Sequence, residues 1–441
     1  MDTIPHSKIP ISSADSALQG KRVAMVVFSS YPADPRPRRA VETLLKEGMT
    51  VDLICLGDEK APRHERRSGL DILRVPLTHK RGGKLSYAYE YSAFIAISAG
   101  ILASRCLKRR YDLVYIHNMP DVLVACALLP KAVGAKVILD QHDPMPELMM
   151  TIFNLDETSR SVRLLSWLEK WSIARANLVI TVNVACKRIF GSRSCPPEKI
   201  GVVMNAPDES IFPFREARPF AFGSQESARP FVIMYHGSLV ERNGLDLAVE
   251  ALAHLRTAIP TAELRIYGRK TPFLETVMAK ICNTKLESCV SYLGPKSLED
   301  LLVEIENCDL GIIPNHRNAF AEINTPTRIF EYLALGKPVV APCAEGICDY
   351  FDDRSMVFFE LGSAKDLARK IEYVFSSPAE VFEIVKRGQA VYQRHCWRTE
   401  RQRLTNLVSE LLGGKARQID GEGAFAATRD AIEPFAHPME N

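Results

Sequence analysis

Residues 322–342 read EINTPTRIFEYLALGKPVVAP, a stretch that predicts a short helix leading directly into a buried strand. Thr325 is a residue type that caps helix N-termini, Pro326 suits the first helical position, and Gly336 suits the end of the last turn. The apolar run that follows, residues 338–341, is typical of a strand covered on both faces. A helix followed at once by such a strand indicates an α/β fold built on a parallel sheet.

Strands and helices alternate on the N-terminal side of this stretch as well. The expected elements, strand and helix in turn, occupy residues 232–235, 244–257, 262–267, 272–284, 290–293, 298–307 and 310–313. Short apolar strands alternating with helices of this length are typical of a doubly wound sheet with helices on both faces. We therefore expect a Rossmann-like domain at residues 231–397.

A second series with the same rhythm precedes residue 205. Apolar strands are expected at residues 21–28, 51–56, 111–117, 136–141 and 178–182, with helices at 37–47 and 122–133. These elements predict another Rossmann-like domain at residues 21–204. Between the two domains, residues 205–230 are rich in Pro, Phe, Ser and charged residues, which is the composition of a linker.

Two such sheets in tandem predict a cleft between the domains, because ligands of doubly wound sheets bind at the carboxyl ends of the strands. Outside the domains, residues 1–20 are expected to form a flexible leader. Residues 398–412 predict a helix, and residues 413–441 have the small, polar composition of a mobile tail.

The composition is that of a globular protein, with 46% hydrophobic and 25% charged residues over 441 positions. The formal net charge of +3 argues against a dedicated nucleic-acid-binding protein. The 11 cysteines form no CxxC pair and no cluster with metal-ligand spacing, so we expect reduced thiols, with neither a disulfide framework nor a metal site. No secretory signal is visible, and a cytoplasmic location is expected.

Residues 92–107, SAFIAISAGILASRCL, carry a single charge, at Arg105. The stretch is shorter than the ~20 residues that a membrane-spanning helix needs. Tyrosines precede it within residues 87–91, and Lys-Arg-Arg follows it at residues 108–110, which suits a helix at the membrane interface. A helix buried against the sheet is the alternative. The two interpretations are compatible if one side of the helix packs in the protein core while its basic end contacts anionic lipid.

Several common active-site motifs are absent from the sequence. There is no GxxxxGK[ST] phosphate-binding loop, no GxGxxG after the first expected strand, and no GxSxG or HExxH. The sequence therefore argues against a P-loop ATPase, a dehydrogenase, and the common hydrolase and zinc-protease chemistries.

The N-terminus of the helix within residues 322–342 lies at the mouth of the predicted sheet. Free amides and the positive end of the helix dipole make such an N-terminus an anion site that suits a diphosphate. Glu331 follows Pro326 by five residues, roughly 7.5 Å along the helix axis. Its carboxylate could accept both hydroxyls of a ribose attached to that diphosphate. A solvated glutamate on an ordinary helix face is the alternative.

This stretch closely resembles the donor-binding helix of glycosyltransferase family 4, enzymes of the GT-B fold. In that family a Glu-x7-Glu motif ends in a ribose-binding glutamate, which corresponds to Glu331, and LGKPVV continues the similarity. The first glutamate of the motif falls at Ile323, so the sequence departs from the pattern there, and the neighbouring Glu322 is the candidate substitute. The resemblance implies a GT-B architecture of two tandem Rossmann-like domains, with helix 398–412 packing back on the first domain.

Other segments extend the resemblance over most of the chain. Residues 235–244, YHGSLVERNG, are similar to the loop that opens the second domain in this family, where a lysine usually stands at the position of Asn243. Arg242 is expected to offset the charge of the departing diphosphate, and a surface arginine near a turn is the alternative. By resemblance, the donor is expected to contact Gly237, Ser238, Arg242, Gly268, Gly294, Glu322, Asn324, Thr325, Thr327 and Glu331.

In the first domain, residues 139–147 read LDQHDPMPE and follow an expected strand directly. By resemblance His142 takes the place of the active-site histidine that contacts the donor sugar, and a hydrogen-bonding loop histidine is the alternative. The loop at residues 29–39 is similar to a variant found among bacterial polysaccharide glycosyltransferases. The candidates for acceptor binding are Asp34, Arg38, Asp143 and Glu147.

The resemblance implies a retaining glycosyltransferase that uses a nucleoside-diphosphate sugar and needs neither metal nor cofactor, with His142, Arg242 and Glu331 at the catalytic centre. A glycan or polyprenyl-linked precursor of a cell-surface polysaccharide is the expected acceptor, met at the cytoplasmic face of the inner membrane. No nucleic-acid partner is expected. Three alternatives stay open: a catalytically silent scaffold of the same fold, which the isoleucine at position 323 favours, a nucleotide-sugar epimerase, and an interfacial membrane-binding protein without activity.

Overall fold

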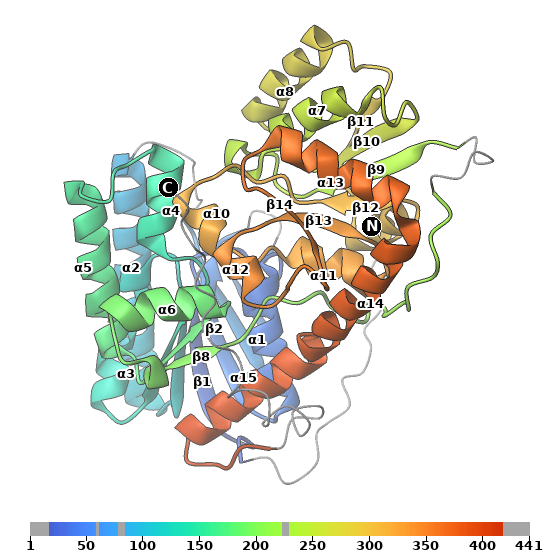
Figure 1. Cartoon of the computed structure of the whole chain (residues 1–441). Helices are drawn as coiled ribbons and strands as arrows, with labels where there is room; N and C mark the ends of the chain where they lie inside the picture. Colours follow the sequence, from blue (N-terminus) through green and yellow to red (C-terminus); the bar gives the residue numbers. More distant parts are fainter. Residues whose placement is uncertain (1–16, 59–60, 78–83, 223–228, 418–441) are drawn as a thin grey trace.

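Two sheets, each covered by helices, form the frame of the protein (Figure 1). The computed structural model describes residues 17–58, 61–77, 84–222 and 229–417. The first sheet has the order β3-β4-β2-β1-β5-β6-β7-β8 and is parallel except for the β3–β4 pair. Its strands are β1 (Arg22–Val26), β2 (Thr50–Leu56), β3 (His64–Arg67), β4 (Leu70–Val75), β5 (Leu113–His117), β6 (Lys136–Gln141), β7 (Leu178–Thr181) and β8 (Ile200–Val202).

Successive residues of a strand point to opposite faces of a sheet. In the first sheet both faces are buried, each in its own hydrophobic core. On β1, Ala24 and Val26 belong to one hydrophobic core, and Val23 and Met25 belong to the core on the other face. The helices that cover these faces are α1 (Pro35–Lys46), α2 (Lys84–Lys108), η1 (Asp121–Ala127), α3 (Leu128–Ala132), α4 (Met145–Phe153), α5 (Arg160–Arg175), α6 (Val184–Arg193) and η2 (Pro197–Lys199).

The second sheet is parallel throughout, in the order β11-β10-β9-β12-β13-β14. Its strands are β9 (Phe231–His236), β10 (Ala262–Tyr267), β11 (Val290–Gly294), β12 (Leu310–Ile312), β13 (Val339–Pro342) and β14 (Val357–Phe359). Its helices are η3 (Glu241–Asn243), α7 (Leu245–Leu255), α8 (Pro272–Asn283), α9 (Leu298–Glu306), α10 (Ala319–Ile323), α11 (Thr327–Ala334), α12 (Glu345–Cys348) and α13 (Ala364–Ser376). The predicted α/β class with two doubly wound domains is therefore confirmed.

The strand order of each sheet reverses next to its first strand. In the first sheet β2 and β5 flank β1, and in the second β10 and β12 flank β9. Ligand crevices form at such switch points, outside the carboxyl ends of the strands. Since β9 ends at His236, this residue and the loop after it lie at the switch point of the second sheet.

The C-terminal helices α14 (Pro378–Arg394) and α15 (Trp397–Leu411) run from the second domain down to the first (Figure 1). On α15, Leu404 and Val408 join the core beneath α1. The buried Glu400 accepts a hydrogen bond from the Met204 amide at 2.8 Å, which fixes α15 to the chain just after β8. This helix therefore ties the two domains together a second time.

Between β8 and β9 the described residues form no helix or strand. Phe212, Ala217 and Phe222 nevertheless pack into the core of the second domain. The Arg215 amide donates to the Ala334 carbonyl at 2.7 Å. The segment predicted as a linker is thus anchored along much of its length to the second domain; its residues 223–228 lie outside the described part.

Helix α2 contains the apolar stretch at residues 92–107. Phe94, Ser98 and Leu102, which are four residues apart, are fully buried and form the inner side of the helix. Leu107 is 83% exposed, and Ile97 is exposed as well. The stretch therefore packs on the sheet with one side and meets solvent with the other. Among the described residues, no helix is long and apolar enough to cross a membrane.

Two details of the first domain differ from the sequence expectations. The helical segment expected at residues 122–133 is present, but as the 3-10 helix η1 followed by the short α-helix α3. Strand β3, HERR, was not predicted, because it is a charged edge strand without the apolar pattern of a buried one.

The expectations for the chain ends also need correction within the described residues. Leu18, in the segment predicted as a flexible leader, is 1% exposed and fills the core beside α1. In the segment predicted as a mobile tail, the Arg417 amide donates to the side chain of Asn406 at 3.0 Å. Residues 1–16 and 418–441 lie outside the described residues.

Candidate donor site between the two domains

Helix α11 begins later than the sequence predicts. It spans Thr327–Ala334, and Pro326 takes the capping position. Thr325 cannot cap the helix, because its hydroxyl donates to the Gly346 carbonyl at 2.5 Å and accepts from the Asn183 side chain of the first domain at 2.9 Å. The predicted capping role of Thr325 is therefore wrong, and Thr327 provides the first helical amide.

Glu331 extends from α11 to the end of β9. Its Oε2 lies 2.6 Å from Nε2 of His236, while Nδ1 of His236 lies 2.8 Å from the Tyr332 hydroxyl. The Tyr332 hydroxyl also donates to the Met234 carbonyl at 3.0 Å, which extends this chain of contacts into β9. The Glu331 side chain keeps 15% of its surface exposed. Its carboxylate is thus held in one orientation and still accessible.

Three predicted donor-binding glycines lie side by side beyond β9, β10 and β11. The Gly237 amide donates to the Tyr267 carbonyl, and the Gly268 amide donates to the Gly294 carbonyl, both at 3.0 Å. A Cβ atom on Gly268 would lie 2.2 Å from the Gly237 carbonyl oxygen, so no larger residue fits. Backbone groups of three loops therefore form a compact floor next to His236.

The loop between β9 and α7 positions Ser238 and Arg242. The Ser238 carbonyl accepts hydrogen bonds from the Tyr235 hydroxyl and from Nδ2 of Asn243, both at 2.9 Å. Burial lowers the pKa of Arg242, and the opposing charge that acts most strongly on it is Asp143 of the first domain. Burial in turn raises the pKa of Asp143, and Arg242 counteracts this. Arg242 of the second domain and Asp143 of the first thus act on each other as opposite charges.

The segment before α11 belongs to the domain interface. Ile323, at the position of the first motif glutamate, is 5% exposed and packs in the core of the first domain. Its carbonyl accepts from the Asn183 side chain at 2.7 Å. The adjacent Glu322 accepts instead from Nη1 of Arg317 at 3.1 Å, and Asn324 ends α10. The carboxylate of Glu322 is therefore engaged with Arg317.

In the first domain, His142 follows β6 and lies beside His117, the last residue of β5. The Nε2 atom of His142 is 3.2 Å from Nδ1 of His117, which is 3.3 Å from Oδ2 of Asp140. Burial keeps the pKa of His142 well below its ordinary value, against the pull of Asp140, so the imidazole is neutral. Although burial opposes it, the Arg36 guanidinium holds the pKa of Asp140 far below its ordinary value. A buried ion pair thus supports the histidine.

Ligand atoms of His117, Asp140 and His142 converge within 4.8 Å, as in a metal site. A cation there would stand next to Arg36, whose Nη2 is 2.6 Å from Oδ1 of Asp140. The Tyr115 hydroxyl also donates to Asp140, at 2.9 Å. Since the charge of Asp140 is already compensated, the arrangement favours a hydrogen-bonded network over a metal site.

The side chain of Asn118 joins the loops beneath His142. Its Oδ1 accepts from the His142 amide at 2.9 Å, and its Nδ2 lies 2.9 Å from the Asp143 carbonyl and 2.6 Å from Oε1 of Gln141. Nδ2 also lies 3.1 Å from Oδ1 of Asp121, whose second oxygen has no partner among the described residues. Burial raises the pKa of Asp121 to about 7.

The other acceptor candidates are divided between two places. Asp34 caps α1 at the carboxyl end of β1, and Arg38 follows one turn later, 3.9 Å from Glu42. Glu147, on α4, accepts from Nη1 of Arg193 at 2.6 Å. Asp34 and Arg38 thus flank the switch point of the first sheet, while Glu147 is held in an ion pair.

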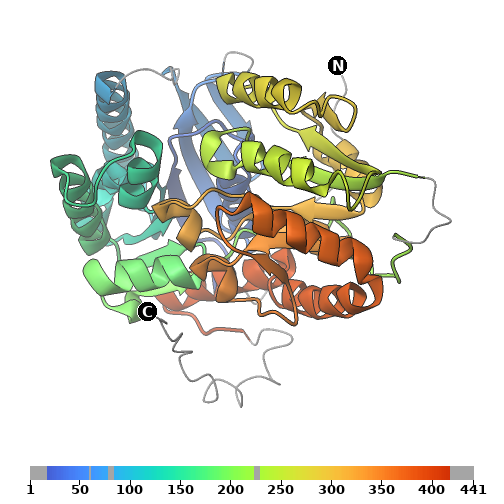
Figure 2. The same cartoon turned by 45° about the horizontal axis from the view of Figure 1, so that its top comes forward.

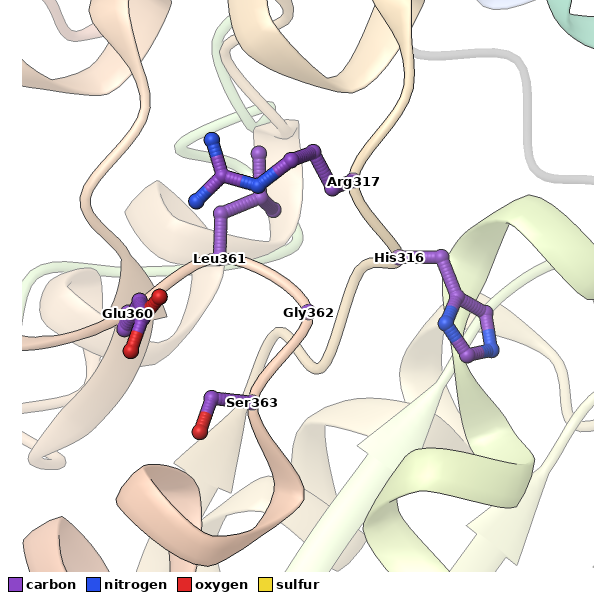
Figure 3. Close-up of a pocket in the computed structure, with 6 residues that line it drawn as sticks. All are labelled: His316, Arg317, Glu360, Leu361, Gly362 and Ser363. Atoms are coloured by element: carbon purple, nitrogen blue, oxygen red, sulfur yellow. The ribbon is translucent and has the colours of Figure 1, made fainter.

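A surface pocket lies between the loops after β12 and β14 (Figure 3). Arg317 reaches over the loop after β14, whereas His316 turns away from it and bonds Asp246 of α7 at 2.8 Å. Arg317 is engaged with Glu322 at 3.1 Å, and none of the predicted donor residues lines the pocket. The candidate site therefore centres on Glu331 and the glycine floor.

Three residues beside Glu331 and Gly237 are not among those predicted from the sequence: His236, Arg328 and Tyr332. Arg328 precedes Glu331 by three residues, so helical periodicity places both on one face, and this signal is visible in the sequence. His236 gives no such signal, because its partner Glu331 is 95 positions away.

Comparisons with known proteins show which families the two domains match. Residues 33–206 match the family described as glycosyl transferase 4-like domain, and residues 218–391 match the family described as glycosyl transferases group 1. Two curated relatives are the colanic acid biosynthesis glycosyltransferase WcaL of Escherichia coli and the amylovoran biosynthesis glycosyltransferase AmsK of Erwinia amylovora. Each is 25% identical over 49% of this chain and 52% of its own length, so the match spans about half of each relative.

Solved structures share the fold over both domains. Sucrose-phosphate synthase from Thermosynechococcus elongatus superposes with a TM-score of 0.72 at 17% identity, covering 89% of this chain and 99% of that one. Anabaena HepE, solved in complex with UDP-glucose, superposes with a TM-score of 0.63 at 17% identity, covering 88% and 99%. At this identity the likeness shows the fold alone.

The buried Asp121 predicts a pH dependence of stability. Its pKa is about 7 in the folded protein against an ordinary value of 3.8. Between these values the folded protein keeps a proton that the unfolded chain has released, so the free energy of unfolding falls as pH rises from about 4 to 7. Asp121→Asn removes this contribution and should gain stability relative to the wild type over that window, by up to about 1 kcal/mol per pH unit.

Urea unfolding followed by tryptophan fluorescence at several pH values measures this difference. The signal reports the first domain, because Trp167 and Trp171 lie on α5 and Trp397 lies on α15. Glu157→Gln, a change at an exposed position of the same domain, should leave the pH profile unchanged. Parallel profiles for the wild type and Asp121→Asn would contradict the assignment.

Proposed function

The chain belongs to the group 1 glycosyltransferases and has their GT-B fold, and on this basis we propose that it transfers a sugar from a nucleoside-diphosphate sugar with retention of configuration. The proposed acceptor is a glycan or polyprenyl-linked precursor of a cell-surface polysaccharide. The names of WcaL and AmsK, both polysaccharide biosynthesis glycosyltransferases, support the acceptor class. The complex of HepE with UDP-glucose supports a nucleotide-sugar donor.

The observation that carries the proposal is the fixed carboxylate of Glu331 at the switch point of the second sheet. His236 orients this carboxylate from below, and its exposed surface is available to the two hydroxyls of a ribose. The amide of Thr327 opens the same helix, just over one turn before Glu331. A diphosphate at the helix N-terminus and a ribose at Glu331 therefore fit one nucleotide.

Cleavage of the bond between sugar and diphosphate builds negative charge on the leaving group. In the proposed mechanism, Arg242 and the first amides of α11 stabilise that charge without a metal ion. Across the cleft, the neutral imidazole of His142 can hydrogen-bond the sugar while the acceptor hydroxyl attacks from the same face. Closure of the domains would exclude water and so limit hydrolysis of the donor.

Nucleotide binding tests the donor site. We expect one of UDP, GDP and ADP to bind with micromolar affinity, and Glu331→Ala to weaken this binding at least about tenfold, because the ribose hydroxyls lose a charged acceptor. Isothermal titration calorimetry measures both. The variant Glu322→Ala, on the neighbouring helix α10, distinguishes the role of Glu331 from that of Glu322. It should bind nucleotide more tightly than Glu331→Ala. Absence of binding by all three nucleotides to the folded wild type would instead favour a catalytically silent scaffold.

The proposed retention of anomeric configuration and the proposed independence from metal ions can be tested with the same reaction. With the donor identified, proton NMR of the first-formed product should show the anomeric configuration of the donor sugar, and EDTA should leave the rate unchanged. An inverted product would refute retention. A rate that falls with EDTA and recovers with added Mg²⁺ would refute transfer without metal.

We also propose that the first domain binds the cytoplasmic face of the membrane. Leu107 on α2 and Leu128 and Leu129 on α3 are exposed, and these two helices pack against each other. Two further apolar residues, Leu164 and Trp167, are exposed on α5, which lies at the same edge of the molecule (Figures 1 and 2). Three exposed basic residues lie at the end of α2 and directly after it, Lys108, Arg109 and Arg110, which suits contact with anionic lipid.

Flotation with vesicles that contain anionic phospholipid tests this contact. Charge reversal of all three basic residues, Lys108→Glu, Arg109→Glu and Arg110→Glu, should abolish co-flotation and leave nucleotide binding intact. The matched control reverses three exposed lysines of the second domain, Lys270, Lys365 and Lys386, and should float like the wild type. Equal flotation of all three proteins would rule out the basic end of α2 as the membrane contact.

A further inference from the structure

Arg328 extends from α11 back to the loop that follows β9. Its Nη1 donates to the His236 carbonyl at 2.7 Å, and its guanidinium carbon lies 4.9 Å from the centre of the Tyr235 ring. A Cβ atom built on Gly237 would lie 3.4 Å from Cδ and 3.5 Å from Nη1 of Arg328. The side chain therefore lies directly against the predicted donor-binding glycine.

The positive charge of Arg328 has no acidic counterpart in the part of the chain that the structure describes, where it forms no ion pair. Other arginines are paired with carboxylates, among them Arg36 with Asp140 and Arg317 with Glu322. Arg328 is half-buried, and one hydrogen bond uses only one of the five N–H donors of a guanidinium. The remaining donors and the net charge are available to an anion.

The loop after β9 itself is short of positive charge. Asn243 stands where related enzymes usually have a lysine, and its Nδ2 is used to hold the Ser238 carbonyl at 2.9 Å. Arg242, the other cation of this loop, forms no ion pair with any described residue. A departing diphosphate carries more than one negative charge, and one arginine compensates it only in part.

We infer that Arg328 supplies the second cation that binds the donor diphosphate, in place of the lysine absent at position 243. The inference rests on the proposed donor site and extends it. Arg328 and Glu331 are three residues apart on one helix face, about 4.5 Å along its axis, so one rigid element presents a cation for the diphosphate and a carboxylate for the ribose. His236 joins the two, because its carbonyl holds Arg328 and its ring holds Glu331.

A purely structural role is the competing explanation, since Arg328 also holds the β9 loop through the His236 carbonyl. The two roles differ in which ligand they affect. A diphosphate-binding cation contributes to UDP and to inorganic pyrophosphate but leaves uridine unaffected. A residue that only shapes the loop affects UDP and uridine alike, because both use the same glycine floor and Glu331.

The experiment compares wild type, Arg328→Gln, Arg328→Lys and the control Arg317→Gln by calorimetry with UDP, uridine and inorganic pyrophosphate, and with GDP or ADP and its nucleoside if UDP does not bind. We expect Arg328→Gln to lose about 10- to 100-fold in affinity for the nucleoside diphosphate and for pyrophosphate, as for a lost charged hydrogen bond, with nucleoside binding unchanged. Arg328→Lys should recover part of the loss because it restores the charge. Arg317→Gln should bind like the wild type.

Every alternative result would contradict either the role of Arg328 or the proposed function. An equal loss for the diphosphate and the nucleoside in Arg328→Gln would show a structural role, and no loss for either would show no role. If the wild type binds pyrophosphate through Arg328 but no nucleotide, the proposed function fails while the anion site stands. If the folded wild type binds none of the probes, both fail.

Discussion

The imidazole of His236 joins the central strand of the second sheet to α11, the helix of the proposed donor site. One ring nitrogen contacts Glu331 at 2.6 Å and the other contacts Tyr332 at 2.8 Å, so two consecutive residues of α11 are fixed by one side chain of β9. The Tyr332 hydroxyl continues the chain to the Met234 carbonyl. Because all of these groups are buried or nearly so, a shift of α11 along the sheet would leave polar atoms without partners, which is costly. The position of the helix N-terminus follows from this constraint.

The first domain uses a related arrangement. His117, at the end of β5, lies between the buried Asp140 and the cleft residue His142, and Arg36 compensates the charge of Asp140. In both domains, then, a buried histidine at the carboxyl end of a strand contacts a candidate site residue, Glu331 in the second domain and His142 in the first. Each histidine is connected to an element that is distant in sequence: His236 contacts Tyr332 of α11, and His117 contacts Asp140, which pairs with Arg36 of α1. The polar network thus makes the geometry of each crevice depend on the packing of the whole domain.

The two halves of the site are also coupled to each other. Asn183, which caps α6 of the first domain, holds both the Ile323 carbonyl and the Thr325 hydroxyl just before α11. The side chain of Ile323 completes a hydrophobic core of the first domain. A glutamate at that position would have to bury its charge there, so the departure from the family motif is consistent with an interface that the apolar residue stabilises. Contacts that hold the domains together therefore lie directly beside the start of the donor helix.

By itself the sequence determined the α/β class, the two doubly wound domains, the GT-B architecture and the presence of Glu331 on a short helix before a buried strand. These features depend on local periodicity, on turn residues such as Gly336 and on a motif of neighbouring residues, all of which are visible along the chain. Only the tertiary structure decided that Thr325 bonds Gly346 and Asn183 instead of capping α11, that Glu322 pairs with Arg317, and that His236 and Arg328 adjoin Glu331 and Gly237. Such contacts depend on how whole elements pack, because a short polar side chain bonds whichever group the fold brings within about 3 Å, however distant in sequence.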